Sequence, residues 1–429
     1  MGSSRFVFGA TYVPRVVDTQ LDALLPEIAA IQLDGPKAVG KTETALQRVA
    51  LVRRLDRASV AAVAAADPDA FIDFRDPMLL DEFHRVPGLW DAVKRRVDTG
   101  APPGSYLLTG SAQQGPSHSG AGRILPIRMR PLSLPERGLC TPTVSLAELL
   151  DGSASIQGRC ALRLADYAAE IARSGFPALQ GLSDRAAQNQ LDGYLSRIVD
   201  RDVEEAGLRV RRPATMMAWL RAYAAATATT TSWEKIRDAA TPGSSQKPAK
   251  STTIPYVDAL TQLRILDEVP AWAPTRNQLH RLMQGGKHHL ADPALAARLL
   301  RVNAAALLRG EGEVLSAEDG SLLGRLFESL VTMSVRVFAG ASDASTSHLR
   351  VNSGRHEVDL IVERQSDGSL VAIEVKLSAS VDETDVRHLH WLQGELGAQL
   401  ADAVVLTTGE QAYRRRDGIA VVPLGLLGP

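Results

Sequence analysis

The amino-acid sequence predicts an α/β protein built from three parts: a parallel-sheet domain over residues 1–145, a helical and winged-helix region over 146–275, and a second α/β domain over 276–429. In the first part, short apolar runs that end in polar residues alternate with helical spacing. Ala-rich helices dominate beyond Leu146, and two alternating strands flank a short turn in the last third. A chain of 429 residues has room for about three domains at ~150 residues each.

The composition is that of an ordinary globular protein, with 45% hydrophobic and 23% charged residues. A formal net charge of −1 produces no overall field that attracts nucleic acid or a membrane, so any basic binding surface must be local. No apolar run approaches the ~18 residues of a membrane span, so no membrane partner is expected. Cys140 and Cys160 form no C-x-x-C motif, which favours a reducing, cytoplasmic compartment.

The first part reads as alternating helices and strands. Val17–Ala30 has leucines at helical spacing, Ala30–Leu33 is a short buried strand, and Thr42–Leu55 resumes helical spacing. The apolar runs Met78–Leu80 and Tyr106–Leu108 each precede polar residues. Strands that alternate with helices in this way predict a parallel α/β sheet.

A phosphate-binding loop follows the first of these strands. The pattern G-x-x-x-x-G-K-[ST] is matched in full by Gly35-Pro36-Lys37-Ala38-Val39-Gly40-Lys41-Thr42. Backbone N–H groups of such a loop surround phosphate oxygens, Lys41 is expected to reach the β- and γ-phosphates, and Thr42 is expected to coordinate Mg²⁺. The N-terminus of the following helix also favours anions. The sequence therefore predicts a P-loop NTPase domain that binds ATP with Mg²⁺ and hydrolyses it.

Polar residues after the next two strands extend this site. Asp81 directly follows an apolar run and is expected to hold Mg²⁺, while Glu82 is expected to polarise the attacking water; an acidic helix start is the alternative. The hydroxyls of Thr109 and Ser111 are expected to sense the γ-phosphate, with a polar turn as an equal alternative. Arg123 is a candidate arginine finger, in cis or on a neighbouring chain, and a solvated side chain is the alternative.

The last third contains a second set of candidate catalytic residues. Two alternating strands are joined by the turn Asp367-Gly368, and side chains two apart on a strand share a face. Glu374 and Lys376 therefore project together, and Asp359 can meet them from the paired strand. Asp359 and Glu374 are the predicted metal ligands, Lys376 completes a D…E-x-K arrangement, and Glu328 on the preceding helix is an extra carboxylate. A purely structural acid–lysine pair is the alternative.

Taken in order, these motifs resemble a family of prokaryotic AAA-type ATPases whose members carry a C-terminal domain of unknown function related to restriction-endonuclease folds. The resemblance implies an ATP-binding domain fused to a restriction-endonuclease-like (PD-(D/E)XK) domain, and it leaves the activity of the second domain open. It covers nearly the whole chain and rests on Gly35–Thr42, Leu80–Leu89, Leu108–Ala112, Gly122-Arg123, Pro131–Ser133, Ser174–Pro177, Tyr194, Arg201-Asp202, Thr252–Leu260 and Gly418–Leu424.

Two residues depart from the family pattern. Lys37 stands where an arginine is expected, and Ser174 stands where a second glycine is usual. Neither departure removes a catalytic group.

The middle region carries weaker signals. Ser232–Trp272 resembles a winged helix-turn-helix with Thr252–Leu263 as its second helix, and Lys247 and Lys250 before that helix suit phosphate contacts. A packing module between two larger domains is the equal alternative. Lys287-His288-His289 lacks the spacing of metal ligands, which favours a structural role.

The leading functional hypothesis is an ATPase that couples its nucleotide state to a nucleic-acid-directed, nuclease-like C-terminal domain, in defence or as a toxin-like module. The alternative is a nucleotide-controlled binding switch whose nuclease-like domain is inactive and holds DNA or a protein partner. A third hypothesis is a molecular machine that does not act on nucleic acid. The predicted partners are thus ATP and, as open alternatives, DNA, RNA or a protein, and a finger acting in trans requires an oligomer.

Overall fold

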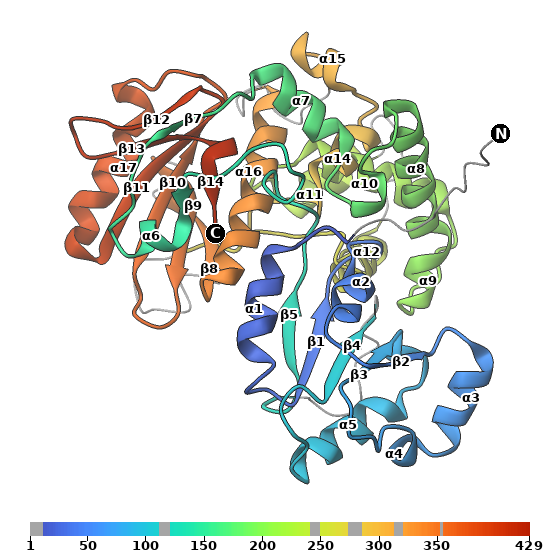
Figure 1. Ribbon diagram of the computed structural model, residues 1–429. Coiled ribbons are helices and arrows are strands. Elements are labelled where there is room, and N and C mark those ends of the chain that lie inside the picture. The colour runs from blue at the N-terminus through green and yellow to red at the C-terminus, as the bar shows by residue number, and fades with distance from the viewer. Residues whose placement is uncertain (1–11, 111–120, 241–248, 273–284, 313–320, 352–354) are drawn as a thin grey trace, which may run out of the picture.

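The computed structural model describes residues 12–110, 121–240, 249–272, 285–312, 321–351 and 355–429 (Figure 1). Two β-sheets lie at different ends of the molecule, and a layer of helices lies between and beside them. No helix in the described ranges combines the length and the hydropathy that crossing a bilayer requires.

The first sheet is fully parallel, with strand order β2-β3-β4-β1-β5. Because β4 lies between β1 and β3, Thr109 pairs with Leu33 on one side and with Asp81 on the other, so the carboxyl ends of these strands meet at one edge. The elements of this part are α1 (Val16–Leu24), β1 (Ala30–Asp34), α2 (Lys41–Leu46), β2 (Leu51–Arg54), α3 (Ala58–Ala66), α4 (Pro68–Phe71), β3 (Met78–Asp81), α5 (Gly88–Asp98), β4 (Tyr106–Thr109) and β5 (Leu125–Arg128).

The helix predicted over Thr42–Leu55 is wrong in its second half. The helix after the loop, α2, ends at Leu46, and residues 51–54 form β2 at the edge of the sheet. Alternating side chains in Leu51–Arg54 pair in register with β3, and this pairing overrides the helical spacing. The parallel P-loop sheet itself is confirmed.

The middle region is helical and packs around α14 and α16. A π-helical turn, Ile198–Asp202, joins α8 to α9. After α12, Leu266 and Val269 form isolated antiparallel bridges with Leu290 and Lys287, so helices are followed by a short paired segment. The winged-helix fold stays a prediction. The helices are α7 (Leu164–Arg173), α8 (Asp184–Arg197), α9 (Val203–Glu205), α10 (Pro213–Ala225), α11 (Trp233–Ala239), α12 (Lys250–Gln262), α14 (Pro293–Leu299) and α15 (Ala304–Leu308).

The second sheet is mixed, with order β7-β12-β13-β11-β10-β9-β8. Val371 and Ile373 of β10 face the side of the long helix α16, whereas Leu370 and Ala372 face α17, and Figure 1 shows these helices on opposite sides of the sheet. Its elements are α16 (Leu322–Ala341), β8 (Ala344–Val351), β9 (His356–Arg364), β10 (Leu370–Val375), α17 (Glu383–Leu396), β11 (Leu400–Thr407), β12 (Gln411–Arg414) and β13 (Ala420–Pro423).

The short segment after the first sheet joins the C-terminal part of the molecule. In it, β6 (Val144–Ser145) pairs with β14 (Leu427–Gly428), α6 (Leu146–Leu150) packs on β10 and β11, and β7 (Gly158–Arg159) extends the second sheet beside β12. These contacts lie on both sides of the predicted boundary at 145/146, which stays a prediction, and they join the segment around it to strands of the C-terminal part. Pairing between segments this distant leaves no local signal in the sequence.

Candidate functional site

The loop between β1 and α2 has the backbone shape that its glycines allow. Gly40 has a φ of 102°, a left-handed conformation that L side chains rarely adopt. A Cβ atom on Gly35 would lie 2.4 Å from the carbonyl oxygen of Met129. Arg15 braces the loop from outside, because its guanidinium donates to the Val39 carbonyl at 2.8 Å and pairs with Glu136 at 3.0 Å. No sequence pattern pointed to Arg15.

Lys41 lies inside this loop. Its Nζ atom donates to the carbonyls of Gly35 and Pro36 at 2.7 and 2.8 Å, and the residue is only 7% exposed. Burial lowers the pKa of Lys41 to about 8, although the carboxylates of Glu82 and Asp34 act in the opposite direction. The loop therefore presents a buried cation at the edge of the sheet, where backbone N–H groups and a positive side chain suit a phosphate group.

Asp81 joins the loop to the neighbouring strands. Its Oδ1 atom accepts hydrogen bonds from the hydroxyl of Thr42 at 2.8 Å and from that of Thr109 at 2.7 Å. The three residues come from α2, β3 and β4, and the strand order brings them together. A threonine hydroxyl and a carboxylate in direct contact are the donor set that Mg²⁺ takes beside nucleotide phosphates.

Glu82 has an unusual backbone, with a φ of 58° and a ψ of 40°. Burial, together with the neighbouring Asp81 carboxylate, raises the pKa of Glu82 above its ordinary value. His84 Nε2 lies 3.5 Å from Glu82 Oε2, and burial lowers the pKa of His84. A strained backbone at a carboxylate beside the loop is typical of functional positions.

A pocket of about 810 Å³ opens between this loop and the helical region. Its far wall includes Pro177, Tyr194 and Arg197, so the helices after residue 164 complete the site. Lys37 reaches across: its Nζ atom lies 2.7 Å from Asp202 Oδ1 at the π-helical turn, and 2.7 Å from Glu205. Although burial acts to lower the pKa of Lys37, these two carboxylates outweigh it and raise the pKa.

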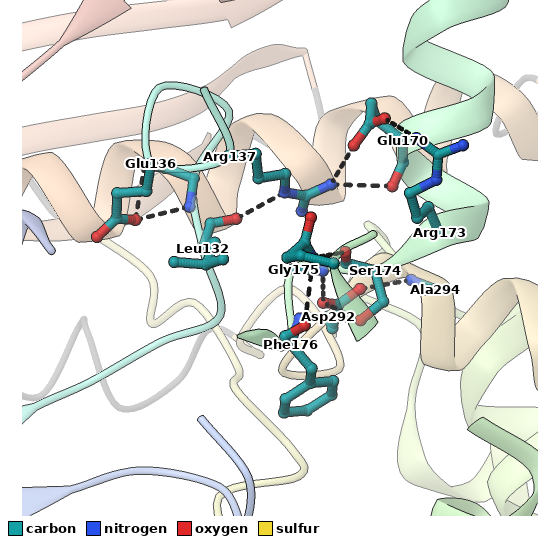
Figure 2. Close-up of polar contacts among 12 residues, drawn as sticks. Leu132, Glu136, Arg137, Glu170, Arg173, Ser174, Gly175, Phe176, Asp292 and Ala294 are labelled. Atoms are coloured by element: carbon teal, nitrogen blue, oxygen red, sulfur yellow. Dashed lines mark hydrogen bonds and ion pairs between the residues drawn. The ribbon is translucent and has the colours of Figure 1, made fainter. Parts of the chain in front are cut away.

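The two non-catalytic motifs, Pro131–Ser133 and Ser174–Pro177, meet in a joint behind this pocket (Figure 2). The Leu132 N–H donates to the Gly175 carbonyl, and the Gly175 N–H donates to the Asp292 carboxylate, both at 2.7 Å. Ser174 has a φ of 82°, a left-handed conformation that favours glycine, and its hydroxyl donates to Asp292 at 2.9 Å. The joint thereby fixes the wall that carries Phe176 and Pro177.

Among the described residues, the predicted Arg123 does not join the nucleotide site of its own chain. Arg123 precedes β5 at the amino end of the sheet, where it pairs with Asp98 at 2.8 Å, while the phosphate loop lies at the carboxyl end. The interpretation of Arg123 as a finger in cis is therefore wrong, since it sits at the opposite edge from its own loop, and a role in trans stays a prediction. Ser111 lies outside the described residues.

The C-terminal candidates lie on neighbouring strands. The antiparallel pairing of β10 with β9 runs as far as Ile373 and Leu360, so Glu374 and Asp359 lie just beyond its last registered pair on adjacent strands. Asp359 Oδ2 accepts from the Val375 N–H at 2.9 Å, and Lys376 lies 3.3 Å from Glu374. Burial, and secondarily Asp359, raises the pKa of Glu374, and its Oε1 atom has no hydrogen-bond partner among the described residues.

Lys287, from the segment set aside as structural, enters this cluster. Its Nζ atom lies 2.7 Å from Glu328 Oε1 on α16, 3.0 Å from Asp359 Oδ1 and 3.5 Å from Glu357 Oε1. Burial, and then Asp359, raises the pKa of Glu328 to about 8, while Lys287 acts to lower it. The sequence around Lys287 gives no sign of this role, since the run Lys287-His288-His289 lacks the spacing of metal ligands.

That Asp359 and Glu374 hold a divalent ion stays a prediction. Within the described ranges, one group of three potential ligands has all its ligand atoms within 4.8 Å of one another, and it consists of Glu383, His390 and Asp417. Glu328 and Asp359 converge on Lys287 instead, and Glu374 pairs with Lys376.

A buried ion network joins the first sheet to the segment that carries Lys287. The carboxylate of Asp267 forms ion pairs with three guanidinium groups: Arg130 at 2.7 Å, Arg336 at 3.4 Å and Arg128 at 3.5 Å. Burial acts to raise the pKa of Asp267, but the arginines outweigh it and hold the pKa well below its usual range. The Asp267 N–H also donates to the His289 carbonyl at 2.9 Å, so the network ends two residues from Lys287.

Comparisons with known proteins agree with the site at the first sheet. Residues 28–137 match the family model of an AAA domain, and residues 164–306 and 323–427 match two models that are each described as a domain of unknown function. Together with the parallel sheet and the Gly35–Thr42 loop, the first match identifies an AAA-type P-loop ATPase domain.

Similar proteins include uncharacterized proteins of Mycobacterium tuberculosis and Mycobacterium bovis, each 23% identical over 419 residues, 94% of this chain and 82% of theirs. A Walker-type ATPase of Pyrococcus abyssi aligns with 67% of this chain and 96% of its own, at 14% identity and a TM-score of 0.37.

Proposed function

We propose that the chain binds ATP with Mg²⁺ at the Gly35–Thr42 loop, hydrolyses it, and uses the nucleotide state to control the C-terminal domain. The observation that carries the proposal is the pair of hydrogen bonds that Thr42 and Thr109 donate to Asp81. These bonds hold a hydroxyl and a carboxylate at the mouth of a loop whose backbone and lysine suit phosphate.

Each residue of this site has a distinct task in the proposal. Thr42 and Asp81 would hold Mg²⁺, which would neutralise charge that develops on the phosphate oxygens. Lys41 exchanges its bonds to the Gly35 and Pro36 carbonyls for the phosphates. Glu82, whose pKa is raised, accepts a proton from the attacking water.

Control by nucleotide is proposed to pass through the walls of the pocket. Lys37 is part of the phosphate loop and also pairs with Asp202 and Glu205 in the helical region. On the other side, Asp34 directly precedes the loop and pairs with Arg264, which follows α12. A rearrangement of the loop around phosphate alters both contacts, so each helical neighbour senses the bound nucleotide.

For the C-terminal domain we propose a restriction-endonuclease-like fold that serves as a binding module, with nucleic acid as its first candidate partner. The ammonium group of Lys287 between Glu328 and Asp359 favours binding without metal-dependent cleavage. The pairing of Glu374 with Lys376 beside Asp359 supports the second candidate, a Mg²⁺-dependent nuclease.

The test compares two variants of the nucleotide site. Lys41→Ala is expected to weaken ATP binding by roughly 10–100-fold, because a charged hydrogen bond to phosphate is lost. Glu82→Gln is expected to spare binding and slow hydrolysis by ~10²-fold or more, because only activation of water is lost. Asp76→Asn, an exposed acid before β3, is the matched control. Calorimetry that shows unchanged ATP affinity in Lys41→Ala contradicts the proposal.

A cleavage assay separates the two candidates for the C-terminal domain. Single- and double-stranded DNA and RNA are incubated with the protein and Mg²⁺ or Mn²⁺, with and without ATP. Cleavage that Asp359→Asn abolishes supports the nuclease, and salt-sensitive binding without cleavage supports the binding module.

A further inference from the structure

Lys287 places its charge in a buried position between carboxylates from separate elements. Glu328 belongs to α16 and Asp359 to β9, and the ammonium group contacts both at 2.7 and 3.0 Å. The Lys287 side chain is 2% exposed, whereas Lys376, the lysine expected from the strand pattern, is 31% exposed and pairs with Glu374 instead. The buried cation of the cluster is thus a residue from outside the strand pair.

The backbone fixes Lys287 on both sides. Its N–H donates to the Val269 carbonyl at 2.8 Å, and the Val269 N–H donates to the Lys287 carbonyl at 2.9 Å. The next residue, His288, donates its N–H to Thr229 at 2.8 Å and accepts from Ala228 at 2.7 Å. The main chain is thus held on both sides of Lys287, and from there the side chain extends to the carboxylates of Glu328 and Asp359.

The ammonium group of Lys287 occupies the position that a divalent cation bound by Glu328 and Asp359 would take. Carboxylate oxygens hold Mg²⁺ at about 2.0–2.1 Å and Ca²⁺ at 2.3–2.6 Å, so an ion shared by Glu328 and Asp359 would lie where Nζ lies. Two cations at this spot would repel in a setting where little water screens them. Glu374 adds a buried carboxylate next to Asp359, and its Oε1 atom lacks a partner among the described residues.

We propose that Lys287 is the resident cation of the Glu328–Asp359 cluster, that it excludes divalent ions from the C-terminal domain, and that a small neutral residue at position 287 would turn the cluster into a Mg²⁺ or Mn²⁺ site. The proposal concerns the C-terminal cluster alone and stands whether or not the phosphate loop hydrolyses ATP. In this proposal Glu328 and Asp359 pair with Lys287 and not with a metal ion, and the lysine is their counter-ion.

The test measures Mn²⁺ binding to the nucleotide-free full-length chain by electron paramagnetic resonance and calorimetry. Wild-type protein and Asp359→Asn are expected to bind Mn²⁺ equally, because the cluster of the wild-type protein holds no ion. Lys287→Ala is expected to gain one Mn²⁺ per chain with at least tenfold higher affinity than any wild-type binding, and Lys287→Ala/Asp359→Asn is expected to lose it. Lys376→Ala, which removes the other lysine, is expected to gain no such site.

Two further measurements keep the proposal testable if Lys287→Ala folds poorly. Lys287→Ser keeps both acids and also places a small neutral side chain at position 287, and its melting temperature is expected to rise with Mn²⁺. Lys287→Arg retains a cation and is expected to exclude Mn²⁺ as wild type does. Asp359-dependent Mn²⁺ binding in wild type, or a folded Lys287→Ala protein without the new site, overturns the proposal, and neither result bears on ATP hydrolysis.

Discussion

The guanidinium of Arg264 lies 2.7 Å from the carboxylate of Asp34, the residue immediately before the phosphate loop. Arg264 follows α12, so this ion pair ties the edge of the first sheet to the segment that continues toward Asp267. Arg128 lies 3.5 Å from both Asp34 and Asp267, and it connects the two carboxylates into one network.

The first prediction concerns the centre of that network. Asp267→Asn is expected to lower the free energy of unfolding by about 3 kcal/mol at pH 7, because it leaves buried arginines without their counter-charge. Asp69→Asn, which breaks an exposed pair with Arg95, is expected to change stability far less, because solvent screens that pair. Urea titrations at pH 7 measure both changes.

The same variant has a defined pH dependence. Since the folded pKa of Asp267 lies below its unfolded value near 4, its stabilising effect is complete above that value and is lost as the pH falls. The difference between wild type and Asp267→Asn is therefore expected to be constant from pH 7 to about pH 5 and to shrink below pH 4. A difference that grows toward low pH contradicts the assigned role.

The second prediction follows from the lowered pKa of Lys41, about 8. Bound phosphate favours the protonated amine, so ATP binding at pH 8.5 is expected to take up roughly three-quarters of a proton. Affinity is expected to fall about fivefold between pH 8 and pH 9. Calorimetry in two buffers of different ionisation enthalpy measures the uptake. Lys37→Ala should retain it, since carboxylates raise the pKa of Lys37.

The third prediction concerns Arg123, which lies at the edge of the sheet away from its own phosphate loop. If Arg123 completes the site of a neighbouring chain, the hydrolysis rate per chain rises with protein concentration. Arg123→Ala is then expected to abolish that rise without changing ATP affinity, since a finger contributes ~10³-fold or more to the rate. Arg57→Ala, another exposed arginine of this domain, serves as the control. Turnover that is independent of concentration in every variant leaves Arg123 a surface residue.

The fourth prediction concerns the joint behind the pocket. A Cβ atom at Gly175 would lie 2.6 Å from the Leu132 carbonyl oxygen, so Gly175→Ala is expected to lower the free energy of unfolding by about 1–3 kcal/mol. Gly193→Ala, on α8 with open space around it, is expected to raise it by up to about 1 kcal/mol. Thermal unfolding compares the two variants; equal effects would mean that the joint is not tightly packed.

Ser174→Gly at the same joint combines two opposing changes. Glycine relieves the strain of a φ of 82°, but it removes the hydroxyl that donates to Asp292. Because each effect is on the order of 1 kcal/mol, the net change in stability is expected to stay within about 1 kcal/mol.

Local patterns predicted the three central strands β1, β3 and β4, because each of these apolar runs ends in a polar residue at the site. Asp81 was expected beside Thr42, and the structure has the two side chains in contact. Lys287 and Asp267 gave no such signal, because each forms its ion pairs with residues that are distant in the sequence. Arg15 is a further example, since its contacts with Val39 and Glu136 depend on the fold.

The pairing of β6 with β14 and of β7 with β12 has a consequence for the order in which a growing chain can fold. The first sheet has all its strands once Arg128 has been made, but about 250 residues separate β7 from β12. At 5–20 residues per second, this distance takes roughly 10–50 s to synthesise. For that interval Leu146, Leu149 and Leu150 of α6 have no β10 or β11 to cover them, so a newly made chain presents an apolar helix that only its last hundred residues can bury.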